Sequence, residues 1–162
     1  MAAIYSKDQI MDWLSAVRDP EIPVLSLIDL GVIRDVTTEG DAVVIEMTPT
    51  FVGCPALDVM QSEIREVLKG HGVVRVDIIV SYKTPWTSDL ITEKGRSALR
   101  EFGLAPPPRK AIVTDLDILE HATCPRCGGT DTEVRNTFGP TLCRSIHYCN
   151  TCREAFEQFK PI

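Results

Sequence analysis

The sequence predicts an α+β protein in two parts, a small α/β sandwich over residues 1–103 and a compact β domain over residues 111–162. Three observations lead to this prediction. Helical and strand-like apolar spacings follow one another through the first part. A proline-rich stretch then interrupts the pattern. Beyond it, two pairs of cysteines stand in a segment too short to build a large apolar core of its own.

The first helix has a clear beginning and end. Ser6 and Gln9 have the spacing of a capping box, in which each side chain bonds the other's backbone N–H. Ile10 and Leu14 then recur on one helix face. Asp19-Pro20 is expected to end the helix, because the residue before a proline avoids the helical region.

Three strands are expected in the first part. Residues 30–36 and 42–48 flank a short polar turn and predict a hairpin, and residues 74–80 alternate as a third strand. Pro55 suits the first position of a second helix that ends at Gly70. A third helix is expected from Ser88, as its cap, to Phe102.

Residues 104–110 form a proline-rich linker, which we expect to be stiff, and the domain boundary is placed there. The second domain is expected to begin near residue 111. Short strands are predicted around residues 132–138, 142–148 and 154–160.

Four cysteines of the second part have the spacing of metal ligands. They are Cys124, Cys127, Cys149 and Cys152. Two residues separate the thiols of each pair, so a tight turn can point both sulfurs at one ion, and two such knuckles complete a tetrahedral zinc site. Gly128 and Gly129 follow the first knuckle, where we expect positive φ. The pattern predicts a structural zinc ribbon. An iron–sulfur cluster or a redox dithiol on the same residues remains an alternative.

Composition and charge restrict the partners. Residues 1–103 carry 16 acidic and 10 basic side chains, whereas residues 104–162 carry 7 of each. Phosphate binding needs clustered Lys and Arg, so nucleic acid is a disfavoured partner of this ribbon. No apolar run has the roughly 18 residues that span a membrane, and no signal peptide is visible. We therefore expect a cytoplasmic protein, whose cysteines are ligands or reactive thiols rather than disulfides.

Cys54 stands apart from the other five cysteines. It precedes the predicted second helix, whose first N–H groups favour a thiolate, and Gly53 leaves the sulfur uncrowded. Thr48 and Thr50 offer hydroxyls nearby. This arrangement suits a nucleophile or a soft-metal ligand, and the alternative is an inert cysteine that caps a helix.

Carboxylates in turns are the remaining candidates. Asp19, Glu21 and Asp29 could help to bind a metal or orient the Cys54 loop, or could simply cap turns. The sequence shows no nucleophile–base spacing, phosphate loop, dinucleotide fingerprint or HExxH motif, which weighs against catalysis by this chain.

Several loop motifs of the first part resemble the small α+β domain of iron–sulfur cluster assembly factors of the SufT kind. These motifs are Asp19-Pro20-Glu21, Asp29-Leu30-Gly31-Val32, Thr48-Pro49-Thr50 and Gly53-Cys54-Pro55. The resemblance covers residues 5–103. It implies that Cys54, with Asp29, Thr48 and Thr50 near it, handles iron or a cluster.

The combination with a ribbon resembles the PaaD family of phenylacetate degradation over almost the whole chain. The motifs that carry this resemblance are Trp86-Thr87-Ser88-Asp89, Pro106-Pro107, Cys124-Pro125-Arg126-Cys127, Phe138-Gly139-Pro140-Thr141-Leu142-Cys143 and Cys149-Asn150-Thr151-Cys152.

This resemblance implies an accessory component that helps to mature a metal centre of the phenylacetyl-CoA epoxidase system. Its expected partners are the oxygenase or reductase components, and self-association is left open. The Glu-x-x-His spacing of a di-iron site is absent, so the chain is not expected to epoxidise substrate itself. The alternatives are a structural subunit of the oxygenase complex and a zinc-ribbon nucleic-acid binder.

Overall fold

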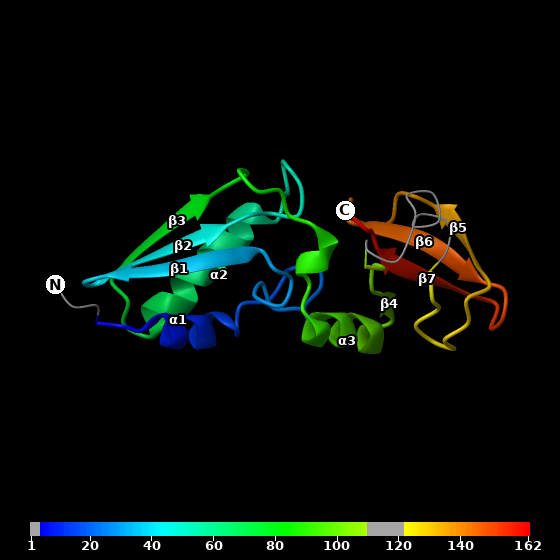
Figure 1. Cartoon of the computed structure of the whole chain (residues 1–162), viewed down its shortest axis with the longest axis horizontal. Helices are drawn as coiled ribbons and strands as arrows, with labels where there is room; N and C mark the ends of the chain where they lie inside the picture. The colour runs from blue at the N-terminus through cyan, green and yellow to red at the C-terminus, as the bar shows by residue number, and fades with distance from the viewer. Residues whose placement is uncertain (1–3, 110–121) are drawn as a thin grey trace. The chain divides into compact units, whose positions relative to one another are not determined.

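The computed structural model describes residues 4–109 and 122–162. The chain divides into two compact units, Met1–Trp86 and Thr87–Ile162. Each unit has its own sheet, as Figure 1 shows. The predicted α+β class is confirmed, and the expected start of the second domain near residue 111 lies outside the described residues.

The first unit begins with helix α1, Lys7–Leu14, whose cap is the predicted one. The N–H of Gln9 donates to Ser6 Oγ, and the N–H of Ser6 donates to Gln9 Oε1 at 2.9 Å, which completes the capping box. The helix stops at Leu14, earlier than the predicted Asp19-Pro20. The backbone continues in tight turns, in which the N–H of Val17 bonds the carbonyl of Leu14.

Three strands form the sheet of this unit in the order β1-β2-β3. Strands β1, Ile33–Glu39, and β2, Ala42–Met47, form the predicted antiparallel hairpin. Strand β3, Arg75–Val80, lies parallel to β2, and helix α2, Leu57–Gly70, makes the crossover between them. Because β1 runs against β2, residues that lead into β1 lie at the same end of the sheet as residues that follow β2.

The core of the first unit lies between the sheet and its helices. Val43, Ile45 and Met47 are buried on β2, while the residues between them are half-buried, as the alternation predicted. Helix α2 buries Met60 and Ile64. Burying an aliphatic side chain of this size contributes about 1.5–3 kcal/mol, so these two layers supply the stability of the unit without a metal.

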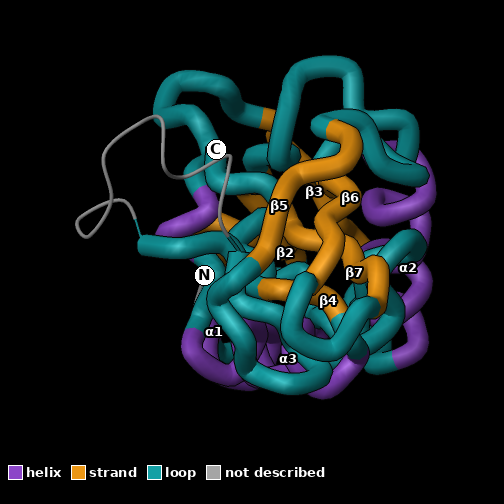
Figure 2. The backbone as a smooth tube through the Cα atoms, turned by 90° about the vertical axis from the view of Figure 1, so that its right-hand side faces the viewer, coloured by secondary structure: helices purple, strands orange, loops and turns teal. Residues whose placement is uncertain are grey.

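The second unit contains a short 3₁₀ turn, Ser88–Leu90, helix α3, Glu93–Phe102, and a four-stranded sheet. Its strands are β4, Leu104–Ala105; β5, Thr132–Asn136; β6, Arg144–Cys149; and β7, Glu154–Phe159. The sheet order is β4-β7-β6-β5, and Figure 2 shows β4 beside β7. The three longer strands confirm the predicted ones. Helix α3 is capped by Thr92 rather than by the predicted Ser88.

Helix α3 and part of the predicted linker belong to the second unit. Strand β4 pairs in parallel with β7, joining Leu104 to Glu157 and Ala105 to Gln158. The division into compact units therefore falls between Trp86 and Thr87, before the predicted linker at residues 104–110. Two residues are too few for a strand to show in the sequence pattern, which explains why this pairing was not predicted.

A buried arginine connects the 3₁₀ turn and the proline-rich segment of the second unit through hydrogen bonds. Arg96 on α3 is 6% exposed, and its guanidinium donates hydrogen bonds to the carbonyls of Ser88, at 2.9 Å, and Pro107. It thus joins the 3₁₀ turn, the helix and the proline segment.

We predict that Arg96→Met destabilises the second unit by about 1–3 kcal/mol, because two buried carbonyls lose their donors. Thermal unfolding and amide exchange of residues 88–107 measure this loss. Arg100→Met, on an exposed position of the same helix, is the matched control. Equal stability of the two variants would contradict the role given to Arg96.

Candidate metal centre and thiol site

The four cysteine thiols predicted as ligands converge on one point. The sulfur atoms of Cys124, Cys127, Cys149 and Cys152 all lie within 4.8 Å of one another. Cys124 and Cys152 Sγ are 3.7 Å apart, and Cys127 and Cys149 Sγ are 3.6 Å apart. Four thiolates at about 2.3 Å from a central zinc would lie about 3.8 Å apart. The spacing is therefore that of a single tetrahedral ion.

The positions of the four sulfurs can be compared with those expected for a redox dithiol and for an iron–sulfur cluster. Both of these short contacts join one knuckle to the other, whereas a redox dithiol pairs the two thiols of one CxxC motif. A cluster binds its thiolates through several irons, which spreads them further apart than one ion does. The residues present fit one ion held by four thiolates.

The two knuckles repeat one backbone turn. The N–H of Gly128 donates to the carbonyl of Cys124 at 2.9 Å, and the N–H of Arg153 donates to that of Cys149 at 2.8 Å. Each of these donors follows the second cysteine of its pair and has positive φ, 73° at Gly128 and 60° at Arg153. Glycine adopts this conformation freely, whereas an arginine there is strained.

Gly129 is needed for space rather than for its backbone angle. Its φ is not among the positive values, so the prediction of positive φ holds for Gly128 and is wrong for Gly129. A Cβ at Gly129 would lie 2.9 Å from Thr151 Oγ1 and 3.2 Å from Cys127 Sγ. A side chain at this position would therefore push the two knuckles apart.

The thiols differ in how readily they lose a proton. The backbone N–H groups of Cys152 and Thr151 are among the groups that lower the pKa of Cys149 to about 6. Burial and the neighbouring thiols raise the pKa of Cys152 to about 12. Four thiolates this close repel one another, so full ionisation needs a cation at their centre.

Cys54 lies in the loop after β2, at the end of the sheet where β1 begins. It is half-buried. Helix α2 starts at Leu57 instead of the predicted Pro55, so the thiol precedes the helix by three residues. Gly53 has a φ of 80° and nothing within 4 Å of the place of its missing Cβ. This φ favours glycine, and the crowding of the thiol by a side chain at this position stays a prediction.

The thiol of Cys54 is held in its protonated form. Burial raises its pKa above the usual value, and the backbone N–H of Ala56 acts in the opposite direction. The carboxylates of Glu21 and Asp19 raise the pKa further. The expectation that the helix start favours a thiolate is therefore wrong in its net effect, because desolvation and two negative charges exceed the contribution of the amides.

The residues proposed to accompany Cys54 divide into two groups. Asp19 is 7% exposed, and its carboxylate accepts hydrogen bonds from the N–H groups of Glu21 and Ile22, each at 2.8 Å. This Asp19–Glu21 turn supplies the charges that act on Cys54. The sequence pattern indicated Asp19 and Glu21 with Asp29 as candidates near the Cys54 loop, and the family resemblance singled out Asp29. The electrostatic effect on Cys54 comes from Asp19 and Glu21.

Asp29 has a different place. Its carboxylate accepts a hydrogen bond from Ser26 Oγ at 2.8 Å, in the turn that leads into β1. Thr48 is 3% exposed and its N–H donates to Val32, while Thr50 is half-buried two residues further on. These residues share the Cys54 end of the sheet, and their contact with the thiol stays a prediction.

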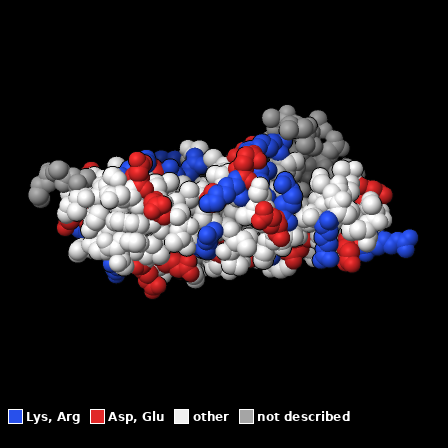
Figure 3. Space-filling model, turned by 90° about the horizontal axis from the view of Figure 1, so that it is seen from below, with Lys and Arg blue, Asp and Glu red and all other residues white. Residues whose placement is uncertain are grey.

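The surface carries both acidic and basic side chains. Acidic and basic side chains alternate over the face seen in Figure 3 without a field of one sign. The prediction that disfavours phosphate binding rests on the balanced charge of residues 104–162. Within the described residues, none of the helices has the length and apolar content to cross a membrane.

Comparison with known proteins assigns both parts of the chain. Residues 7–78 match the model of the family described as iron–sulfur cluster assembly protein, and residues 109–160 match that of the PaaD zinc beta ribbon domain. Among solved structures, a domain of unknown function from Bacillus anthracis is similar with a TM-score of 0.54 and 30% identity, over 57% of this chain and 90% of its own. A conserved hypothetical protein from Thermotoga maritima has a TM-score of 0.51 at 26% identity, over 64% of this chain and 100% of its own.

Two curated relatives match different lengths of this chain. The "Fe-S protein maturation auxiliary factor" of Porphyromonas gingivalis is 34% identical over 62% of this chain and 93% of its own. An Escherichia coli protein, named as one of the subunits of a "Putative 1,2-phenylacetyl-CoA epoxidase", is 39% identical over 95% of this chain and 92% of its own. Fold and site thus define a protein with an iron–sulfur-assembly domain joined to a zinc ribbon. Within this class, the chain belongs to the PaaD family.

We predict that removal of the metal by a chelator unfolds the second unit, because its small core includes ligand side chains. The first unit should keep a cooperative unfolding transition. Amide exchange resolved by segment measures both effects, and metal analysis before chelation should give one ion per chain. Retained protection of β6 and β7 in the metal-free protein would contradict this dependence.

We also predict that Glu21→Gln lowers the pKa of Cys54, because a negative charge that opposes the thiolate is removed. At a fixed mildly alkaline pH, alkylation of this thiol by iodoacetamide should become faster, and its midpoint should move to lower pH. Peptide-level mass spectrometry of the zinc-loaded protein measures the rate. Glu39→Gln, at the far end of β1, should leave the midpoint unchanged.

Proposed function

We propose that this chain is an accessory maturation component of the phenylacetyl-CoA epoxidase system, which assists assembly of an iron or iron–sulfur centre in a protein of that system. One observation supports this most directly. A protein named as an epoxidase subunit matches nearly the full length, while residues 7–78 match a cluster-assembly family. The chain would act in the cytoplasm, where free thiols stay reduced.

Cys54 is the residue proposed to hold the iron or cluster in transit. A protonated, half-buried thiol resists oxidation, because the thiolate is the reactive form. Binding of iron would displace the thiol proton, and the positive charge of the metal would reverse the effect of Glu21 and Asp19 from opposing the thiolate to favouring the complex. A thiol that stays protonated without iron, and acidic side chains that balance the charge of bound iron, both suit a transient carrier.

Thr48, Thr50 and Asp29 are proposed to support this loop. Thr48 fixes the end of β2 against Val32, and Asp29 closes the turn before β1 through Ser26. Oxygen ligands from these residues would be harder than a thiolate, so any contact with iron would be weaker and easier to release.

The four-cysteine centre is proposed to hold a structural zinc. Four thiolates close the coordination sphere and leave no position for substrate, so the ion would stabilise the ribbon rather than take part in the transfer. Zinc has no redox chemistry, which would keep the ribbon intact while iron is handled elsewhere. The ribbon would then serve to bind the oxygenase or reductase component.

A second function is favoured by one observation, that the name of the full-length relative makes it part of an epoxidase. A structural subunit would stabilise the oxygenase complex and would stay bound to it. Fixed stoichiometry with the purified active oxygenase would favour this function, whereas a maturation factor should be absent from the finished enzyme.

We predict that Cys54→Ser keeps the fold and the zinc but loses its support of phenylacetate-dependent growth, because a hydroxyl cannot replace a soft thiolate ligand. Activation of the oxygenase and iron content of the anaerobically purified variant measure the loss, with protein abundance matched to the unchanged chain. Arg65→Lys on α2 is a conservative control. Full growth with Cys54→Ser would rule out the thiol's role and leave the structural function.

A further inference from the structure

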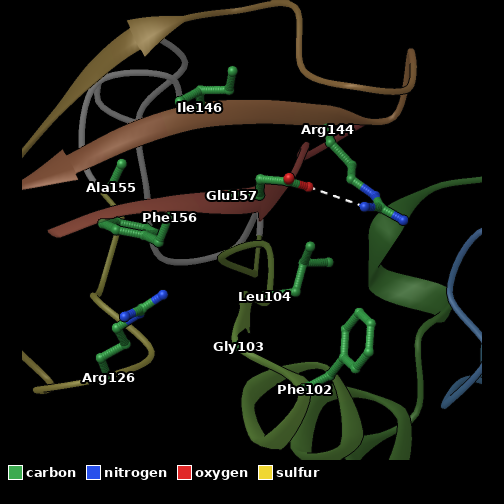
Figure 4. Close-up of a pocket in the computed structure, with 9 residues that line it drawn as sticks. All are labelled: Phe102, Gly103, Leu104, Arg126, Arg144, Ile146, Ala155, Phe156 and Glu157. Carbon is green, nitrogen blue, oxygen red and sulfur yellow. Dashed lines mark hydrogen bonds and ion pairs between the residues drawn. The ribbon is translucent and has the colours of Figure 1, made fainter.

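A pocket of about 440 Å³ lies in the second unit. It is lined by the end of α3, by strands β4, β6 and β7, and by Arg126 of the first cysteine knuckle. Figure 4 shows these elements around the pocket, with Arg126 and Phe102 flanking it on opposite sides. Its size falls in the range of ligand-binding clefts.

The sheet register explains which strand residues face the pocket. On β6, Ser145 and His147 are buried, while Arg144 and Ile146 between them are half-buried and line the pocket. On β7, Glu157 pairs with Ile146 across the ladder and lies on the same face. Phe156 lines the pocket and also belongs to the core cluster that contains Cys124 and Cys149, so the pocket adjoins the metal-ligand core at this residue.

The pocket combines an apolar floor with an aromatic rim. Leu104 is 3% exposed and fills the floor, and Ile146 lies on the sheet. Phe102 remains 48% exposed although it is the last residue of α3. Gly103, with a φ of 91°, turns the chain at once into β4 and leaves the Phe102 ring at the pocket edge. Exposed aromatic residues of this kind are enriched at protein interfaces.

Two guanidinium groups line the pocket and differ in how closely each is paired with a carboxylate. Arg144 Nη1 lies 3.0 Å from Glu157 Oε2, with the arginine side chain 11% exposed, so its charge is balanced. Arg126 reaches only Glu154 among the described residues, at 3.7 Å, and both side chains are more than half exposed. An exposed pair at this distance contributes little, so the Arg126 guanidinium is available for a better-placed carboxylate.

We propose that this pocket is a docking site for a segment of a partner protein that carries an aromatic or large aliphatic side chain next to a carboxylate. The apolar side chain would lie over Leu104 and Ile146 beside Phe102, and the carboxylate would bind Arg126. A guanidinium can hold a carboxylate through two parallel hydrogen bonds, which fixes the direction of the segment. The pocket offers one available guanidinium, that of Arg126, because the guanidinium of Arg144 is already paired with Glu157.

The comparison with relatives adds a reason to expect a protein partner. The site needs both α3 and the ribbon, whereas the maturation factor that matches 62% of this chain is covered to 93% of its own length and has no room for the ribbon strands. The pocket is therefore absent from such a single-domain relative. On the proposed function, it is the element that directs an otherwise general assembly domain to one system.

Arg126 also connects the site to the metal. It stands between Cys124 and Cys127, so the knuckle sets the position of its backbone, from which the side chain reaches the pocket. Zinc at the centre would shape the pocket without touching the bound segment.

The test uses the zinc-loaded full-length protein, ¹⁵N-labelled, and the probe peptide acetyl-Gly-Ser-Asp-Phe-Glu-Ser-Gly-amide. The expected result is a set of amide shift changes confined to residues 102–104, 126, 144–146 and 155–157. Two control peptides replace the phenylalanine with serine, or both acids with their amides. Each should bind at least about fivefold more weakly, as expected when one anchor of a small interface is lost.

Protein variants make the assignment specific. Arg126→Ala and Phe102→Ala should weaken binding by about tenfold while keeping zinc content and the overall spectrum. Arg135→Ala, an exposed arginine of β5 that does not line the pocket, is the matched control and should bind as the unchanged chain does. Equal binding of the three peptides, no shift changes at millimolar peptide, or full binding by Arg126→Ala would overturn the proposal. Binding of phenylacetate alone as strongly as the peptide would also overturn it, in favour of a small-molecule site.

A last arm separates this proposal from the proposed function. Cys54→Ser should bind the peptide normally, whereas Arg126→Ala should keep the Cys54 thiol and lose activation of the oxygenase. Normal activation by Arg126→Ala would overturn the docking role and leave the role of Cys54 standing.

Discussion

The convergence of four thiols is the constraint on which the second unit depends. Its small core cluster is built from Ala105, Ala122, Cys124, Cys149 and Phe156, so two ligands are also core residues. Without a cation, these thiols must carry protons in a space of less than 5 Å, and the knuckles lose the centre that fixes them. The turn of the second knuckle places Arg153 at a positive φ that an arginine adopts only under constraint. We therefore expect metal binding and folding to be coupled in this unit.

Cys54 shows the opposite use of a thiol. Its unit has a full apolar core, so the sulfur is not needed for folding. Burial and the acids of the Asp19–Glu21 turn raise its pKa, so the protonated form is favoured until a cation binds. One chain thus contains four converging thiols that fit a resident ion, and a single thiol, Cys54, that belongs to no such group among the described residues. This contrast is what the proposed division into a structural ribbon and a transient carrier requires.

The sequence predicted features that depend on local chemistry. Ser6 and Gln9 specify a helix start through bonds three residues apart, and the CxxC spacing specifies the knuckles. Features that depend on distant segments were missed. Strand β4 exists because β7 offers it an edge, and the pKa of Cys54 depends on acids more than thirty residues earlier. No periodicity within either segment carries that information.

The boundary between the parts illustrates how a ribbon can be joined to an assembly domain. The Thermotoga maritima structure covers 64% of this chain, which is more than the first compact unit contains, so the shared stretch must extend past Trp86. Helix α3 therefore lies within the length that a ribbon-free relative also has, yet Arg96 and β4 bind it into the second unit. In this chain the ribbon gives the end of the helix additional neighbours. Phe102, the last residue of α3, lines a pocket together with residues of β4, β6, β7 and the first knuckle, so the proposed docking site needs both the helix and the ribbon.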